Sequence, residues 1–439
     1  MTTDPPAAAT DDRDPAPWAR LDGVIKLDET DVATLPTSPG VYAFENADGH
    51  TLRLTTTSGL RRAVRDRLAQ RDAVADVPPA FVPIRIRFAA AGSRFEADHI
   101  YLAAARRRLP KSYAMVFDRW ACWFITAVPT SVFPRFTKQR WPGVTFEDAG
   151  VSIGPFADKH AAQRYIEMLD DAFDLCRYHH ILVQAPNGRA CAYKEMGRCA
   201  APCDGTVSMD SYRATFARAV DFAGARYDAW SAEQTTLMHD AGAALRFEEA
   251  REHQRALEAT AFAARPALRW LRRSDNLRGL VAAPSPMKEC WRLFGFAGGR
   301  IESLDDIPAS AADDERRARA EACRDRVRTW MCDLSPAHQE HCALTARTLT
   351  GADRAEAGVF AVPVDACDGP SAAIESAEWD TWLTDWGRIQ SIKVDENRRS
   401  MPKTPTGDGD ESLESAGDMP ECDGTVHRES PADGPSGQM

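Results

Sequence analysis

Residues 191–203 read CAYKEMGRCAAPC, a stretch in which three cysteines lie among Gly and Pro without helical or strand periodicity. Cys176 adds a fourth thiol nearby in the sequence. Four thiolates that close on one ion or cluster can hold together a segment too rich in loops to form its own core. Zinc and an iron–sulfur cluster both suit four thiolates, and the spacing does not choose between them. The candidate metal ligands are Cys176, Cys191, Cys199 and Cys203.

The alternative for this segment is that its cysteines are buried and inert. The clustering argues against it, because the other cysteines are scattered along the chain. His179 and His180 lie close enough in sequence to replace a missing ligand, although they are more typical of surface loop residues. A second group of metal-capable side chains, residues 338–342 (HQEHC), lacks the HExxH order, so we expect a solvated turn there.

Composition narrows the class of protein. The chain has 439 residues, a length typical of several domains, and its 44% hydrophobic content is ample for real cores. No apolar run approaches the roughly 18 residues of a membrane helix, and the N-terminus lacks the pattern of a secretory signal. We therefore expect a cytoplasmic protein with reduced cysteines. The formal net charge of −11 lies mostly in residues 1–17 and 396–439, which we expect to be disordered.

Periodicity predicts an α+β multidomain chain. We expect helices at 59–70, 95–108, 158–175, 208–265 (with a break near Arg246) and 312–330, with strands in 120–155 and 277–304. The predicted domains are a small α/β domain (18–118), a linker with a strand pair and the four cysteines (119–207), a helical region (208–265) and a small α/β region (266–395), between disordered tails (1–17 and 396–439).

Two short basic stretches are candidates for phosphate binding, because local charge matters more than the total. The alternative is that each is a solvated helix face. The candidate DNA-binding residues are Arg61, Arg62, Arg65, Arg106, Arg107 and Lys111.

Three segments, in collinear order, resemble the UvrC family of bacterial nucleotide excision repair. Residues 35–46 (LPTSPGVYAFEN) resemble the opening of its GIY-YIG nuclease domain, and residues 191–203 resemble its cysteine segment. Residues 238–257 resemble the UVR motif, a helical hairpin through which the family pairs with UvrB. The resemblance implies an iron–sulfur cluster on the cysteines, with zinc as the alternative, and both DNA and UvrB as partners. It also implies that the partner-binding residues are Leu245, Phe247 and Glu248.

The nuclease motif departs from the family pattern. The resemblance places the catalytic tyrosine at Tyr42 and the metal-binding glutamate at Glu96, and it predicts that the two lie near each other on one face, with Arg61 and Arg62 nearby. The family's catalytic arginine falls on Ala63, and the family's Tyr-Val-Gly-Lys segment is replaced by residues 53–56 (RLTT). The RNase H-like half of the family is not recognisable. Loss of an arginine that stabilises phosphate charge typically costs on the order of a thousandfold in rate.

Three functions remain open on the sequence. The favoured one is a UvrC-like repair protein that binds DNA and UvrB but cuts poorly or not at all. The second is an active excinuclease that uses Mg²⁺ or Mn²⁺ and cuts beside damage, so enzymatic activity stays undecided. The third is a structural protein built around a metal cluster.

Overall fold

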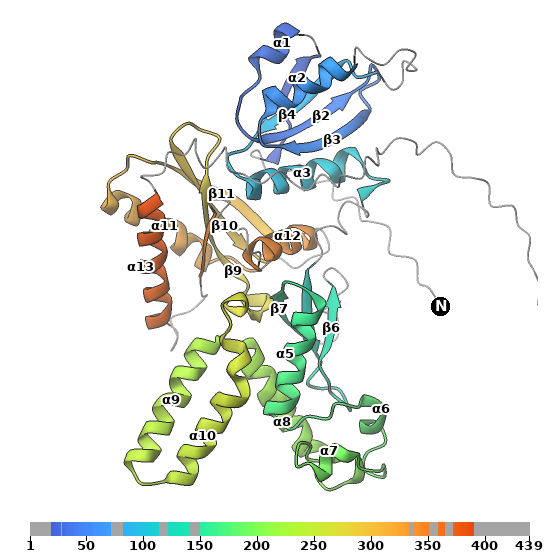
Figure 1. Cartoon of the computed structure of the whole chain (residues 1–439), viewed down its shortest axis with the longest axis vertical. Helices are drawn as coiled ribbons and strands as arrows, with labels where there is room; N and C mark the ends of the chain where they lie inside the picture. The colour runs from blue at the N-terminus through green and yellow to red at the C-terminus, as the bar shows by residue number, and fades with distance from the viewer. Residues whose placement is uncertain are drawn as a thin grey trace, which may run out of the picture. The chain divides into compact units, whose positions relative to one another are not determined.

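The structure is a computed structural model that describes residues 19–27, 29–71, 82–113, 122–140, 150–332, 338–350, 359–364 and 372–389. The two terminal tails predicted to be disordered lie outside these residues. The described part contains three four-stranded antiparallel sheets with helices packed on them, which confirms the α+β class (Figure 1). Within it, no helix is both long enough and apolar enough to cross a membrane.

The first sheet has the strand order β1-β4-β2-β3. Its elements are β1 (Gly23–Lys26), α1 (Glu29–Thr34), β2 (Gly40–Glu45), β3 (Thr51–Thr57), α2 (Leu60–Arg71), β4 (Arg85–Ala90) and α3 (Arg94–Arg108). Strand β2 is buried on both faces, so its alternate side chains enter different cores. Tyr42 and Phe44 pack with α1 and α2, whereas Val41 and Ala43 pack on the side of α3.

The second sheet has the order β6-β5-β7-β8. Its strands are β5 (Trp123–Ala127), β6 (Thr137–Arg140), β7 (Val151–Phe156) and β8 (Arg272–Arg273). Helix α5 (Lys159–Ala172) begins after Asp158, whose carboxylate accepts hydrogen bonds from the backbone N–H groups of His160 and Ala161. The cysteine segment that follows contains only short helices, α6 (His179–Leu182), α7 (Ala192–Glu195) and η3 (Pro202–Asp204).

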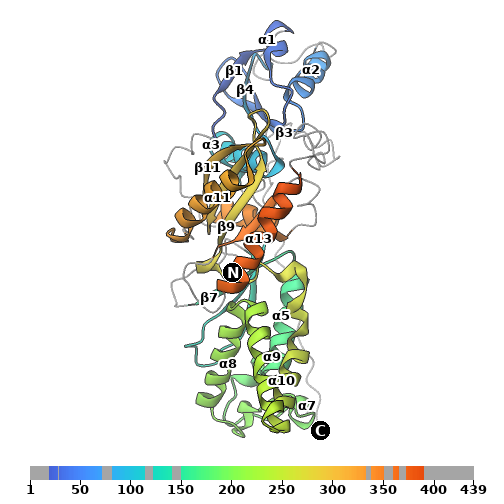
Figure 2. The ribbon, with the colours of Figure 1, turned by 90° about the vertical axis from the view of Figure 1, so that its left-hand side faces the viewer.

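The predicted helical region is three helices, α8 (Met209–Gly224), α9 (Tyr227–Ala243) and α10 (Phe247–Thr260). Ser208 caps α8 by accepting a hydrogen bond from the N–H of Ser211, as its sequence position predicts. The break near Arg246 is confirmed, and a second break at Ala225–Arg226 was not predicted. Helices α9 and α10 form a hairpin (Figures 1 and 2).

The third sheet has the order β11-β10-β9-β12. Its elements are β9 (Arg278–Pro284), β10 (Cys290–Ala297), β11 (Arg300–Pro308), α11 (Asp313–Arg328), α12 (Gln339–Thr350), β12 (Phe360–Pro363) and α13 (Ala372–Ile389). Trp291 and Leu293 of β10 enter a core with α11 and α13. Phe294 and Phe296 enter the core that contains α3 and α12. Helix α3 is therefore shared, because it is buried against both the first and the third sheet.

The solvated turn expected at residues 338–342 is wrong. Helix α12 begins there, with Cys342 fully buried and His341 half-buried. Nδ1 of His341 lies 3.1 Å from Nδ1 of His99 on α3, and the two rings are stacked. Burial lowers the pKa of His341 to about 4, so both rings are neutral at pH 7 and pack as apolar surfaces with one shared hydrogen bond. The polar residues of this segment therefore lie at an interface between α3 and α12.

Candidate functional site

Glu96, the candidate metal ligand, lies in the first turn of α3 and has no exposed surface. Its Oε2 accepts a hydrogen bond from the N–H of Gly92 at 2.8 Å, and its Oε1 lies 2.6 Å from Nη1 of Arg292 on β10. Burial raises the pKa of Glu96 to about 7, although the guanidinium of Arg292 opposes that shift. Both carboxylate oxygens are therefore occupied by groups of this chain.

The partner of Glu96 is itself held in place. Arg292 donates from Nε and Nη2 to the two carboxylate oxygens of Asp306 at 2.9 and 2.8 Å, and Ser285 also bonds to Asp306. Gly92 allows the loop before α3 to approach the third sheet, since a Cβ there would lie 2.0 Å from the carbonyl oxygen of Pro284. The contact between Glu96 and Arg292 is thus part of a fitted junction between α3 and the third sheet.

Tyr42, the candidate catalytic tyrosine, lies in a different core from Glu96. Its side chain is 4% exposed, packs with α1 and α2, and forms an edge-to-face pair with Phe44. Burial raises the pKa of its hydroxyl. Since α3 covers the opposite face of β2, the expectation that Tyr42 and Glu96 lie close together on one face is wrong. Arg61 and Arg62, which were expected near both residues, lie on α2 and thus on the side of the sheet that Tyr42 occupies.

Five of the six candidate DNA-binding residues lie on α2 or α3, which cover opposite faces of the first sheet, and Lys111 lies in the turn after α3. On α2, Arg62 and Arg65 are exposed, whereas Nε of Arg61 donates to the carbonyl of Leu35 at 2.7 Å. At the end of α3, Arg106 pairs with Glu340 of α12 at 3.9 Å. Arg107 and Lys111 are exposed. The structure therefore does not bring the six cations into one patch.

The four cysteines are free thiols, and two of them form a close pair. The hydrogen bond from the thiol of Cys176 lowers the pKa of Cys199, which raises its thiolate fraction. Burial raises the pKa of the Cys203 thiol, as do the negative charge of Asp204 and, to a smaller extent, that of Cys199 and Cys191. In the part of the chain that the structure describes, however, no three His, Cys, Asp or Glu side chains are arranged to hold a metal ion.

The loops that carry the cysteines have protein contacts of their own. The N–H of Ala201, in the left-handed conformation at φ 57°, points to the sulfur of Cys199 at 3.4 Å. Lys194 bonds to Asp204 at 2.5 Å, and the guanidinium of Arg177 lies 4.3 Å from the ring centre of Tyr193. These contacts join the loops that carry the cysteine thiols.

The tip of the α9–α10 hairpin exposes the three candidate partner-binding residues. Leu245 is 72% exposed and Phe247 is 67% exposed, and Glu248 follows in the first turn of α10. Leu245 has a φ of 61°, the left-handed conformation that ends α9 and turns the chain back. Two large apolar side chains on a short turn form an exposed surface that contributes nothing to the cores of the chain.

Two family profiles match the chain. Residues 123–222 match the family described as UvrC/Cho excinuclease, middle domain, and residues 24–108 match a domain of unknown function, DUF7508. The first match spans three strands of the second sheet (β5, β6 and β7), the cysteine segment and most of α8. The second spans the first sheet and α3, so the GIY-YIG character of that region stays a prediction.

Curated relatives extend the match. A UvrABC system protein C from Novosphingobium aromaticivorans is 30% identical over 250 residues, which are 55% of this chain and 36% of that protein. Another from Trichlorobacter lovleyi is 25% identical over 220 residues, 50% of this chain and 36% of the relative. A third from Rhodospirillum rubrum is 26% identical over 295 residues, 64% of this chain and 44% of the relative.

The matched regions thus span less than half of the length of these relatives. No solved structure gives a significant match. The chain therefore carries a UvrC/Cho-type middle domain and is a divergent relative of UvrC.

Proposed function

We propose that this protein acts in nucleotide excision repair as a UvrC-like component that binds DNA and a UvrB-type partner and makes little or no incision through its N-terminal region. The relatives, named as component C of the UvrABC system, support the repair role. The observation that carries the non-catalytic part is Glu96, buried and bound on both oxygens by Gly92 and Arg292.

The chemistry of a one-metal nuclease needs groups that are not available here. Mg²⁺ is held by carboxylate oxygens together with substrate oxygens and water, so its ligand must reach solvent. Glu96 does not, and Tyr42 lies in another core. Ala63 stands where the resemblance requires an arginine, which leaves the developing phosphate charge without its cation.

An incision assay tests this proposal. Damaged duplex DNA is incubated with the protein and UvrB from the same source, in Mg²⁺ or Mn²⁺, with the full-length UvrABC system protein C of Novosphingobium aromaticivorans as the positive control. We expect binding without cleavage. Robust cutting that is lost in Tyr42→Phe or Glu96→Ala would establish the alternative, an active excinuclease, and overturn the non-catalytic assignment.

The hairpin tip is the proposed partner surface. Phe247 and Leu245 are each more than half exposed, and burial of such side chains in a partner's pocket supplies association energy. We expect Phe247→Ala to weaken capture of UvrB at least tenfold while the helical content is unchanged. Met287→Ala, which truncates a comparably exposed apolar side chain on the β9–β10 turn, is the matched control. Equal weakening by both variants, or by neither, would remove the tip from the interface.

DNA binding is proposed for the basic residues of α2 and α3, on two different faces of the first sheet. The double variants Arg62→Ala/Arg65→Ala and Arg106→Ala/Arg107→Ala separate these faces. The face that contacts the phosphates loses affinity and shows a smaller dependence on salt, by about one unit of slope for each lost contact. If neither double variant weakens binding, these residues are solvated helix faces.

The cysteine segment is proposed to bind an iron–sulfur cluster, or zinc, through Cys176, Cys191, Cys199 and Cys203. Four thiolates suit a soft metal. The bound metal or cluster would cross-link the loops around the short helices α6, α7 and η3. Protein purified without oxygen should contain iron and sulfide, or zinc, in an amount that Cys199→Ser loses and Cys290→Ser retains. Metal-free protein with the same melting temperature would refute the site. Bound metal without binding of DNA or UvrB would favour the structural-protein alternative.

A further inference from the structure

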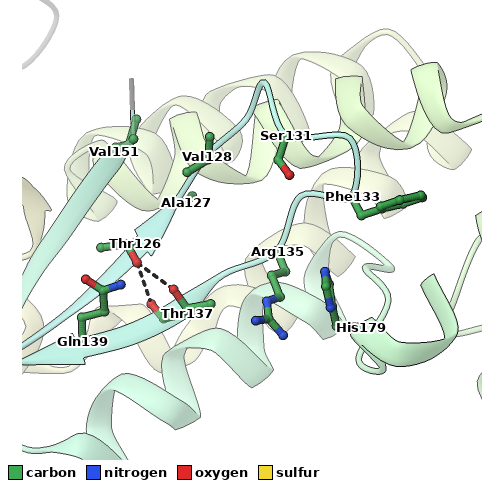
Figure 3. A pocket seen from close by; sticks show the side chains of 11 residues that line it. Thr126, Ala127, Val128, Ser131, Phe133, Arg135, Thr137, Gln139, Val151 and His179 are labelled. Carbon is green, nitrogen blue, oxygen red and sulfur yellow. Dashed lines mark hydrogen bonds between the residues drawn. The ribbon is translucent and has the colours of Figure 1, made fainter. Parts of the chain in front are cut away.

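A pocket of about 310 Å³ opens in the middle domain, between β5, β6 and the start of α6 (Figure 3). It is bounded by the turn that joins β5 to β6 and by the first residue of β7. All of its lining residues lie between Thr126 and His179, so the matched middle domain contains the whole pocket. Of its lining residues, His179 is the one considered above, as a possible replacement for a missing metal ligand.

The side chains that line this pocket are cationic or neutral. Arg135 and His179 both line it, and no Asp or Glu is among the residues that do. Arg135 makes no hydrogen bond or ion pair with the described residues, and its side chain is exposed to the pocket. Most other arginines of this region are paired, as Arg213 is with Asp210 and Arg177 with Asp171. An unpaired guanidinium beside an imidazole favours an anionic ligand.

The neutral lining is of two kinds. Thr126 and Thr137 share a hydrogen bond of 2.7 Å between their hydroxyls, and Gln139 lies beside them on β6 (Figure 3). They can accept and donate hydrogen bonds at one end of the pocket. Phe133 supplies an aromatic wall and is only partly buried in the core. A planar, apolar group with polar edges suits that combination.

From this lining we infer that the pocket binds one nucleotide unit of single-stranded DNA, with its phosphate at Arg135 and His179 and its base against Phe133. The volume lies at the lower end of the range for small-molecule pockets, which suits a single nucleotide. The source of the nucleotide, a DNA strand and not a free nucleotide, rests on the proposed function. The chemistry of the pocket itself does not.

The test measures anisotropy of a fluorescein-labelled oligothymidylate with the wild-type protein, Arg135→Ala and Arg218→Ala. Arg218 is an exposed arginine of α8 outside the pocket, and serves as the matched control. We expect Arg135→Ala to weaken binding about tenfold, the loss of one charged hydrogen bond. The slope of log affinity against log salt should fall by about 0.7. Phe133→Leu should weaken binding about fivefold through lost stacking, with no change of slope.

A second readout uses thymidine 5′-monophosphate and inorganic phosphate. We expect the nucleotide to shift the ring resonances of His179 in the wild type and not in Arg135→Ala. If inorganic phosphate binds as well as the nucleotide and Phe133→Leu changes neither, the assignment of a nucleotide is overturned. If the oligonucleotide binds equally to the wild type and Arg135→Ala, the pocket inference fails while DNA binding stands.

The experiment also distinguishes failure of the proposed DNA function from failure of the pocket inference. If the wild type binds no oligonucleotide but thymidine monophosphate still shifts His179, the pocket binds a nucleotide and the proposed DNA function fails. If no probe shifts His179 and no variant alters binding, the pocket inference is wrong.

Discussion

Glu96 and Phe247 stand in two regions that resemble motifs of the same family, yet they have opposite surroundings. The side chain of Glu96 is 1% exposed and is bound by Arg292, whereas Phe247 is 67% exposed on a turn. A polar group that its own chain satisfies has little left to offer a ligand. An apolar group left in water still gains free energy when a partner covers it. Resemblance in sequence therefore does not carry function equally to both regions.

The largest effect is expected when Glu96 loses its ion pair with Arg292. Arg292→Ala leaves a buried carboxyl without its cation, and we expect the free energy of unfolding to fall by about 3 kcal/mol at pH 8. The loss should be smaller at pH 5.5, because a lone buried Glu96 then takes up a proton.

Urea unfolding at both pH values measures this change. Arg300→Ala removes a partly exposed pair with Glu302 and a contact with the Trp330 ring at the other end of the same sheet, and should cost about 1 kcal/mol. A loss below about 1 kcal/mol for Arg292→Ala would mean that Glu96 is accessible to water, and would reopen the catalytic alternative.

A second experiment probes the junction that buries Glu96. The folded state holds His341 neutral down to about pH 4, whereas an unfolded histidine takes up a proton near pH 6.5. The unfolded state therefore binds more protons between these values, so His341 lowers stability as the pH falls. At pH 5 this contribution is about 2 kcal/mol.

The variant His341→Phe should remove that contribution, so its stability relative to the wild type should rise by about 2 kcal/mol between pH 7.5 and pH 5. The difference between the proteins is the useful quantity, because the raised pKa values of Glu96 and Asp98 act in the opposite direction in both. The exposed His239 provides the control variant His239→Gln, which should show no such change. A parallel pair of curves for His341→Phe would contradict the buried histidine pair.

The smallest expected effect concerns the tip of the α9–α10 hairpin. Leu245 adopts the left-handed conformation, which costs about 1 kcal/mol for a residue with a Cβ. Leu245→Gly should therefore leave stability unchanged or raise it by up to about 1 kcal/mol, while capture of UvrB weakens. Ala244→Gly, one residue earlier at φ −84°, should only destabilise. Thermal unfolding with pull-down checks both, and a destabilised Leu245→Gly would show that the side chain supports the hairpin.

The sequence predicted the local elements well. Helices α2, α3, α5 and α11 and strands β9 to β11 lie where periodicity placed them, and Ser208 begins α8. Helix α12 was not predicted, since it has its apolar contacts with α3, far away in sequence. The polar residues at 338–342 therefore predicted a solvated turn, whereas the structure has the start of a helix packed on the core that contains α3.

The candidate nuclease site shows a different limit. Strand β2 is apolar at nearly every position, so its sequence does not tell which face Tyr42 occupies. The partner of Glu96 lies 196 residues away and is a charged residue within an otherwise apolar strand. Arg292 was therefore visible as an anomaly in the pattern of β10, but only the packing of α3 against the third sheet identifies its partner.

The shared burial of α3 has a consequence for synthesis on the ribosome. Its first sheet is translated early, but the surface that covers its other face comes from β9, β10 and α12, which begins at Gln339. At about 5–20 residues per second, the delay is on the order of ten seconds or more. During that interval the nascent chain lacks the surface that buries Phe95, Ile100 and Glu96 in the folded protein. Until β9, β10 and α12 have been made, the apolar side of α3 therefore lacks its native cover, and such exposed apolar surface favours aggregation.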